Sequence, residues 1–157
     1  MDSQLDLVLH PGDLMVMVRL VLAALAGGVI GWNRFRAGKP AGVGTHALVA
    51  LGAALFVAIP VQMGPATHEG FTRVVQGIAT GIGFIGAGEI FRDADHDRRV
   101  HGLTSAAALW VTAALGVVAG CGSAILIVAA TAFTLLIVLA APHLEHRDPA
   151  RTDRPNG

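Results

Sequence analysis

Glu89 is the one acidic residue inside the long apolar stretches of this chain. A carboxylate is costly to bury among apolar residues, so Glu89 is a candidate site for a cation or a proton. In the simpler interpretation, Glu89 lies at a helix end, where it reaches polar surroundings or pairs with Arg92. The sequence leaves both interpretations open.

Acidic residues and histidines elsewhere could bind a metal ion, but their spacing matches no ligand pattern. Asp93, Asp95 and Asp97 alternate as in a calcium-binding loop, which would need a glycine and a glutamate further along. Arg98 and Thr104 stand at those two positions. A zinc site would need ligands that converge from His46, His101, His143 and His146. We therefore predict a solvated loop and no bound cofactor, with Mg2+ as the one ion still open.

Residues 81–88 contain the glycine pattern GxGxxG. In a dinucleotide-binding fold this pattern joins a strand to a helix, and an acidic residue follows about 20 positions later. Neither feature accompanies the motif here, so we predict instead that small residues let helices approach closely in a membrane. Gly27 and Gly31 repeat the spacing, and we expect their helix to pack against that of the motif. The glycines predicted to pack helices are Gly77, Gly81, Gly83, Gly86 and Gly88.

The positions of the charges define the elements that hold these groups. Hydrophobic residues make up 54% of the chain and charged residues only 14%, too few to cover a water-soluble protein. No charged residue occurs between Lys39 and Glu69, or between Arg99 and Glu145. A membrane-spanning helix needs about 20 apolar residues, so the second stretch can cross twice, with a hairpin near Cys121. We predict spans at about 14–32, 45–63, 74–91, 103–118 and 123–141.

The predicted fold class is therefore all-α, an integral membrane bundle of five transmembrane helices over residues 14–141. Residues 1–13 form a short extracytoplasmic segment, and residues 142–157 a disordered cytoplasmic tail. A cleaved signal peptide is disfavoured, because acidic residues precede the first span. Most of the 11 Lys and Arg residues fall in two connectors and the tail, which places the N-terminus outside and the C-terminus in the cytoplasm. The equal number of acidic residues argues against nucleic-acid binding.

Three segments resemble, in order and spacing, the hallmark segments of the MgtC/SapB family of bacterial inner-membrane proteins. These are AGVGTHALVALG at 41–52, GIGFIGAGEIF at 81–91 and GLTSAAALW at 102–110. The resemblance implies a multi-pass protein of the inner membrane that is linked to magnesium homeostasis and stress adaptation. It also implies a membrane-protein partner such as the F-type ATP synthase, whose inhibition has been attributed to MgtC itself. Longer members carry a soluble C-terminal domain, which we expect this short form to lack.

The chain departs from the family pattern at three positions near one end of the predicted bundle. Asn33 and Gly44 stand where the family usually has a glutamate and an arginine, and Glu89 stands where it usually has an apolar residue. We hypothesise that Glu89 takes over the role of the missing carboxylate and faces Arg34. Their separation would then be no more than about 8 Å, within reach of an appreciable charge interaction.

The family segments add Gln76, His46 and Thr104 as candidate functional residues. In simpler interpretations, Thr104 and Ser105 cap a helix that begins after Gly102, and His46 bonds to a connector backbone. We expect a non-enzymatic modulator of a membrane complex, active in low magnesium or acid stress and able to self-associate. The alternative is a small Mg2+ or H+ carrier or channel whose path is lined by Glu89, Gln76 and Thr104. Three polar groups are few for Mg2+, which loses its water reluctantly, and this favours the modulator.

Overall fold

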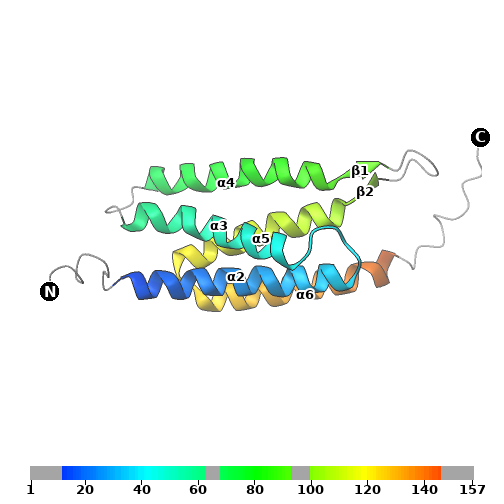
Figure 1. Ribbon diagram of the computed structural model, residues 1–157, viewed down its shortest axis with the longest axis horizontal. Coiled ribbons are helices and arrows are strands. Elements are labelled where there is room, and N and C mark those ends of the chain that lie inside the picture. Colours follow the sequence, from blue (N-terminus) through cyan, green and yellow to red (C-terminus); the bar gives the residue numbers. More distant parts are fainter. Residues whose placement is uncertain (1–11, 63–67, 93–99, 146–157) are drawn as a thin grey trace, which may run out of the picture.

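The computed structural model describes residues 12–62, 68–92 and 100–145. In these ranges the chain forms five helices and one short β-hairpin (Figure 1). The helices are α2 (Asp13–Arg36), α3 (Val43–Gln62), α4 (His68–Glu89), α5 (Leu103–Cys121) and α6 (Ala124–Glu145). Strand β1 (Phe91–Arg92) pairs antiparallel with β2 (Val100–His101) at the junction of α4 and α5. The predicted all-helical bundle is confirmed.

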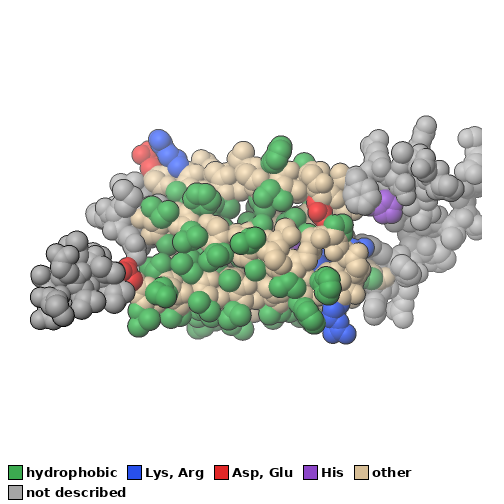
Figure 2. All heavy atoms as spheres, viewed as in Figure 1, with side chains coloured by type: hydrophobic (Ala, Val, Ile, Leu, Met, Phe, Trp, Pro, Cys, Tyr) green, Lys and Arg blue, Asp and Glu red, His purple; other side chains and the backbone are tan. Residues whose placement is uncertain are grey.

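Three of the helices are long and apolar enough to cross a membrane, judged by length and composition: α2, α5 and α6. The helices run side by side, so the described chain begins and ends at opposite ends of the bundle (Figure 1). Large apolar side chains cover the outer surface, as a bilayer-facing surface requires, and Figure 2 shows them along the visible face. The number of spans and the orientation of the termini stay predictions. Helix α4 begins six residues before the predicted span and includes the charged Glu69 and Arg73.

Helix α5 occupies the centre of the bundle and packs against α2, α3, α4 and α6. Its buried face consists largely of small residues, which let neighbouring backbones come close. A Cβ atom placed at Gly116 would collide with the carbonyl oxygen of Ala50, and one at Gly120 with Val57. Gly27 of α2 is pressed in the same way against the backbone of α3 at His46. These close contacts hold α2, α3 and α5 together as the core.

The glycine run of α4 has a different role in the fold from the one expected. A Cβ atom at Gly77, Gly81, Gly83 or Gly88 would meet nothing within 4 Å, whereas one at Gly86 would lie 3.6 Å from Ala106. Helix α4 packs on α5 and less on α3, and α2 packs on α3, α5 and α6. The expected packing of α2 against α4 is therefore not observed, because α3 already covers Gly27 and Gly31. Among the described residues, Gly86 is the one glycine of this set whose Cβ atom would contact another helix, and helix packing by the other four stays a prediction.

Candidate functional site

Four polar side chains gather where α2 and α4 end and α3 and α5 begin. We call Arg34, His46, Glu89 and Ser105 the polar cluster. Arg34 is 3% exposed, Ser105 is 2% exposed and His46 is fully buried, while Glu89 is half-buried. A buried arginine is rare in proteins unless it is paired. The cluster is therefore the strongest candidate for a functional site among the described residues.

Tight turns at this end of the bundle bring the four side chains together. Gly31 of α2 lies against the backbone of Gly42 and Val43, so the end of α2 meets the start of α3. On the other side, Gly102 precedes α5 with a left-handed φ of 89°, a conformation that favours glycine. A Cβ atom at Gly102 would collide with the backbone carbonyl of Glu89. The turn thus fixes the end of α4 against the start of α5.

One hydrogen bond and one charge attraction connect the cluster. The Arg34 guanidinium donates through Nη2 to Ser105 Oγ at 3.0 Å. The carboxylate of Glu89 attracts the Arg34 charge, but no ion pair or hydrogen bond joins the two side chains in the described part of the chain. The two residues thus interact electrostatically, and their separation of no more than about 8 Å stays a prediction. Replacement of the missing family carboxylate by Glu89 stays a hypothesis.

Much of the hydrogen-bonding capacity of the cluster is unused. Arg34 Nε, Glu89 Oε1 and both ring nitrogens of His46 are buried without a hydrogen-bond partner. Each such atom costs about 1–3 kcal/mol relative to a satisfied group. Because these atoms stay without a partner in the folded protein, the cluster can take up a proton, a polar ligand or a group of a partner protein. The His46 side chain makes no bond to the connector backbone in the described part of the chain, and only the backbone N–H of His46 donates to the carbonyl oxygen of Gly42.

The remaining predicted site residues lie outside the cluster. Gln76 and Thr104 are exposed on the outside of α4 and at the start of α5, so neither lines an internal path with Glu89. No side chain caps the start of α5, which corrects the simpler interpretation of Thr104 and Ser105. Among the described residues, no group of three His, Cys, Asp or Glu could hold a metal ion. The loop residues Asp93, Asp95 and Asp97 lie outside the described ranges.

Ser105 is the member of the cluster that sequence reasoning missed as a site residue. Its position shortly after a glycine, at a predicted helix start, is typical of a capping hydroxyl. The helical period is the sequence feature that indicates the burial of Ser105. Ser105 lies on the same face as Leu109, Thr112 and Gly116, all of which are buried.

Arg19 forms a second arginine contact at the opposite end of the bundle. Its Nη1 donates to the carbonyl oxygen of Gly120 at 3.1 Å, and its guanidinium lies over Gly122. A cation at a helix C-terminus satisfies an open carbonyl group and complements the helix dipole. Arg19 therefore caps α5, while Arg34 binds near its start.

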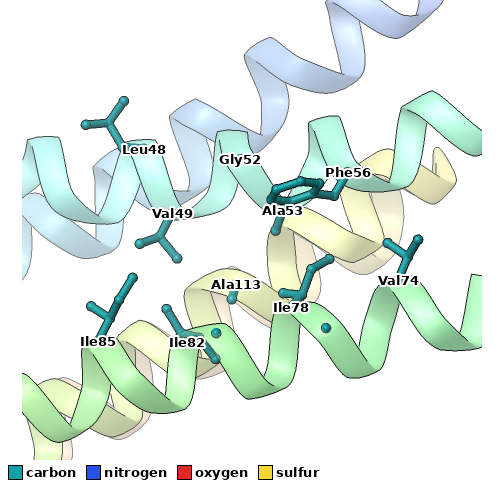
Figure 3. A pocket seen from close by; sticks show the side chains of 12 residues that line it. Leu48, Val49, Gly52, Ala53, Phe56, Val74, Ile78, Ile82, Ile85 and Ala113 are labelled. Carbon is teal, nitrogen blue, oxygen red and sulfur yellow. The ribbon is translucent and has the colours of Figure 1, made fainter.

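An apolar groove with a volume of about 700 Å³ lies between α3 and α4, with α5 as its floor. We call it the α3–α4 groove, and Figure 3 shows its lining side chains. Gly77 and Gly81 lie in its wall, and a Cβ atom at either would meet no described residue within 4 Å. The complete lining is Leu48, Val49, Gly52, Ala53, Phe56, Val74, Gly77, Ile78, Gly81, Ile82, Ile85 and Ala113.

A family model and several relatives agree on the family to which the chain is similar. The model of the MgtC family matches residues 20–147. The chain is 47% identical to the protein SrpB of Synechococcus elongatus, over 87% of this chain and 81% of SrpB. It is 40% identical to the putative magnesium transporter YhiD of Escherichia coli, over 78% of this chain and 58% of that protein. It is 41% identical to the protein MgtC of Brucella abortus, over 76% of this chain and 47% of that protein.

No solved structure matches the chain. The family match covers all five described helices except for the first seven residues of α2. It also includes every residue of the polar cluster and of the α3–α4 groove. The resemblance inferred from the three segments is therefore confirmed, and the chain belongs to the MgtC family.

Proposed function

We propose that the chain is a non-enzymatic modulator of a membrane protein complex in adaptation to low magnesium or acid stress. It would span the bacterial inner membrane five times, with the N-terminus outside and the polar cluster at the cytoplasmic end. The names of two relatives, a putative magnesium transporter and MgtC, support the link to magnesium. The partner complex proposed here is the F-type ATP synthase.

The observation that carries the modulator proposal is the confinement of the polar cluster to one end of the bundle. The other buried polar residues of the described chain are Thr112 and Thr134, and each hydroxyl bonds to a carbonyl of its own helix. The core between the two ends is built from Ala, Leu, Ile and Val. A hydrated Mg2+ ion would need a series of oxygen ligands along its path. A site at one end suits the binding of a partner better than conduction.

The test is a measurement of ATP-driven proton pumping in inverted membrane vesicles, with and without the protein. We expect the wild-type protein to lower pumping, and Glu89→Gln to weaken this effect while the variant still inserts normally. Glu69→Gln is the matched control, because Glu69 is an exposed acid on the same helix. Unchanged pumping in the presence of inserted wild-type protein would argue against this partner.

A parallel flux assay separates the modulator from the carrier. Purified protein in liposomes is expected to give no Mg2+ uptake above that of protein-free liposomes. Protein-dependent uptake that Glu89→Gln abolishes would establish the carrier in place of the modulator. The free acceptor Glu89 Oε1 is the observation that keeps this alternative worth testing.

A further inference from the structure

The α3–α4 groove is open on the outside of the bundle, although both of its walls are apolar. Helices α3 and α4 contact each other only weakly, and the groove passes between them down to Ala113 of α5. Val49 and Phe56 point into it from α3, and the isoleucines of α4 point into it from the other side (Figure 3). In a bilayer, such a surface is covered by hydrocarbon and not by water.

The length of the groove fits one leaflet of a membrane. Its lining on α4 extends from Val74 to Ile85, which is about 16 Å along a helix. The hydrocarbon core of a bilayer is about 30 Å thick, so the groove covers about half of it. A transmembrane helix would need a groove along the whole thickness. A lipid acyl chain, which crosses a single leaflet, matches the observed length.

One end of the groove points toward the polar cluster, although no residue of the cluster lines the groove itself. Glu89 follows Ile85 by four residues on α4, and His46 precedes Val49 by three residues on α3. In a helix these spacings place the residues on the same face, one turn apart. Glu89 Oε1 is buried there without a hydrogen-bond partner. A molecule that fills the groove would therefore carry its polar end beside an unused carboxylate oxygen.

The charges within the polar cluster favour a zwitterionic head group over an anionic one, although the exposed Arg36 and Lys39 add positive charge to the same end. Glu89 and Arg34 carry opposite charges and attract each other, so the cluster is close to neutral as a whole. Arg34 already donates to Ser105 and is almost completely buried, whereas Glu89 is the more accessible of the two. A primary ammonium group has three N–H donors that can satisfy a carboxylate. A head group with only negative charge would meet the carboxylate unfavourably.

We propose that the α3–α4 groove binds one acyl chain of a phosphatidylethanolamine and that Glu89 accepts a hydrogen bond from its ammonium group. The lipid belongs to the leaflet on the side where α4 ends. Gly77 and Gly81 lack side chains because the acyl chain lies over them. This site shares Glu89 with the proposed modulator function, but its test measures lipid binding to the protein alone and needs no partner complex.

The test is native mass spectrometry of the full chain, purified in detergent and supplied with three lipids that carry the same acyl chains. These are phosphatidylethanolamine, phosphatidylcholine, which lacks N–H donors, and the anionic phosphatidylglycerol. We expect phosphatidylethanolamine to bind at least about tenfold more tightly than the other two, as a charge-assisted hydrogen bond worth about 1.4 kcal/mol would give. Equal binding of all three lipids would overturn the role of Glu89.

Two pairs of variants locate the site. Gly81→Leu fills the groove and should abolish retention of the lipid. Gly83→Leu is its matched control, because Gly83 is equally open and exposed on α4 but does not line the groove. Glu89→Gln should remove the preference for phosphatidylethanolamine but leave acyl binding intact, whereas Glu69→Gln should change neither.

Three results would contradict the site. One is equal loss of lipid in Gly81→Leu and Gly83→Leu, and another is an unchanged lipid preference in Glu89→Gln. The third is a shift from dimer to monomer in Gly81→Leu with lipid binding intact, which would make a second copy of the chain the occupant. If Gly81→Leu does not fold, Gly77→Leu repeats the test one turn away in the same groove.

Discussion

The hydrogen bond from Arg34 to Ser105 gives the sharpest test of the polar cluster. Ser105 is 2% exposed and is the one hydrogen-bond partner of the Arg34 guanidinium in the described part of the chain. In Ser105→Ala this donor would be buried without a partner and too deep to reach bulk water. We therefore expect Ser105→Ala to destabilise the protein, although the substitution removes only one oxygen atom.

The expected size follows from two competing estimates. Hydrogen bonds to charged groups contribute about 1.5–3 kcal/mol in water-soluble proteins. Side-chain hydrogen bonds in membrane proteins average only about 0.6 kcal/mol and reach about 1.7 kcal/mol, because the unfolded chain in the membrane also finds partners. The Arg34 bond is charged and buried, which places it near the upper end of the membrane range. We expect a coupling energy of about 1.5 kcal/mol between the two side chains.

A double-mutant cycle measures this coupling through reversible unfolding in mixed micelles. The four proteins are wild type, Arg34→Leu, Ser105→Ala and the double variant. Thr112→Ala combined with Arg34→Leu is the control cycle, because Thr112 is buried on the same helix but bonds to its own backbone. A coupling energy below about 0.5 kcal/mol for Ser105, or an equal one for Thr112, would refute the reasoning.

Four further substitutions test the helix packing, the turn before α5 and the cap at its end. Gly116→Ala should lower the unfolding free energy by about 1–3 kcal/mol, since its Cβ atom would collide with the α3 backbone. Gly83→Ala, where a Cβ atom meets open space, should stabilise the protein by up to about 1 kcal/mol. Equal effects of the two variants in the same unfolding assay would contradict the assigned contacts. Gly102→Ala should lower the thermal midpoint and the yield of folded protein, because φ is positive there and the Cβ collides with the end of α4, and a wild-type midpoint would refute the turn. Arg19→Leu should lose about 1 kcal/mol through the uncapped end of α5, and no change in unfolding free energy would mean that the cap contributes nothing.

The membrane character and the helical fold could be predicted because they depend on composition and on the spacing of charges. Stretches without charge indicate where helices cross, whatever their neighbours are. The helix ends were less predictable, because a helix can continue beyond the apolar residues that cross the membrane. Helix α4 does so at its start, where it includes Glu69 and Arg73.

Helix pairing could not be predicted from the glycine spacing alone. The small-xxx-small pattern occurs in α2, α4 and α5, but it does not specify which helix meets which. Gly27 and Gly116 pack helices, whereas Gly81, in the most conspicuous motif, faces a groove. The approach of Glu89 to Arg34 was predicted from a family comparison. The bond to Ser105 was not, because it depends on the rotation of α5 about its axis.

The two arginine contacts of α2 have a consequence for the way in which the protein is made. Arg19 and Arg34 are separated by 15 residues, and so are their partners on α5, Ser105 and Gly120. Helix α5 is the fourth of the described helices to leave the ribosome. Arg19 and Arg34 are therefore synthesised before their hydrogen-bond partners on α5. Both arginines lie toward the ends of α2, where a long charged side chain can reach the polar surface of a bilayer before its partner has been made. It follows that α2 can enter the membrane ahead of α5 but reaches its final packing only after α5 has been synthesised.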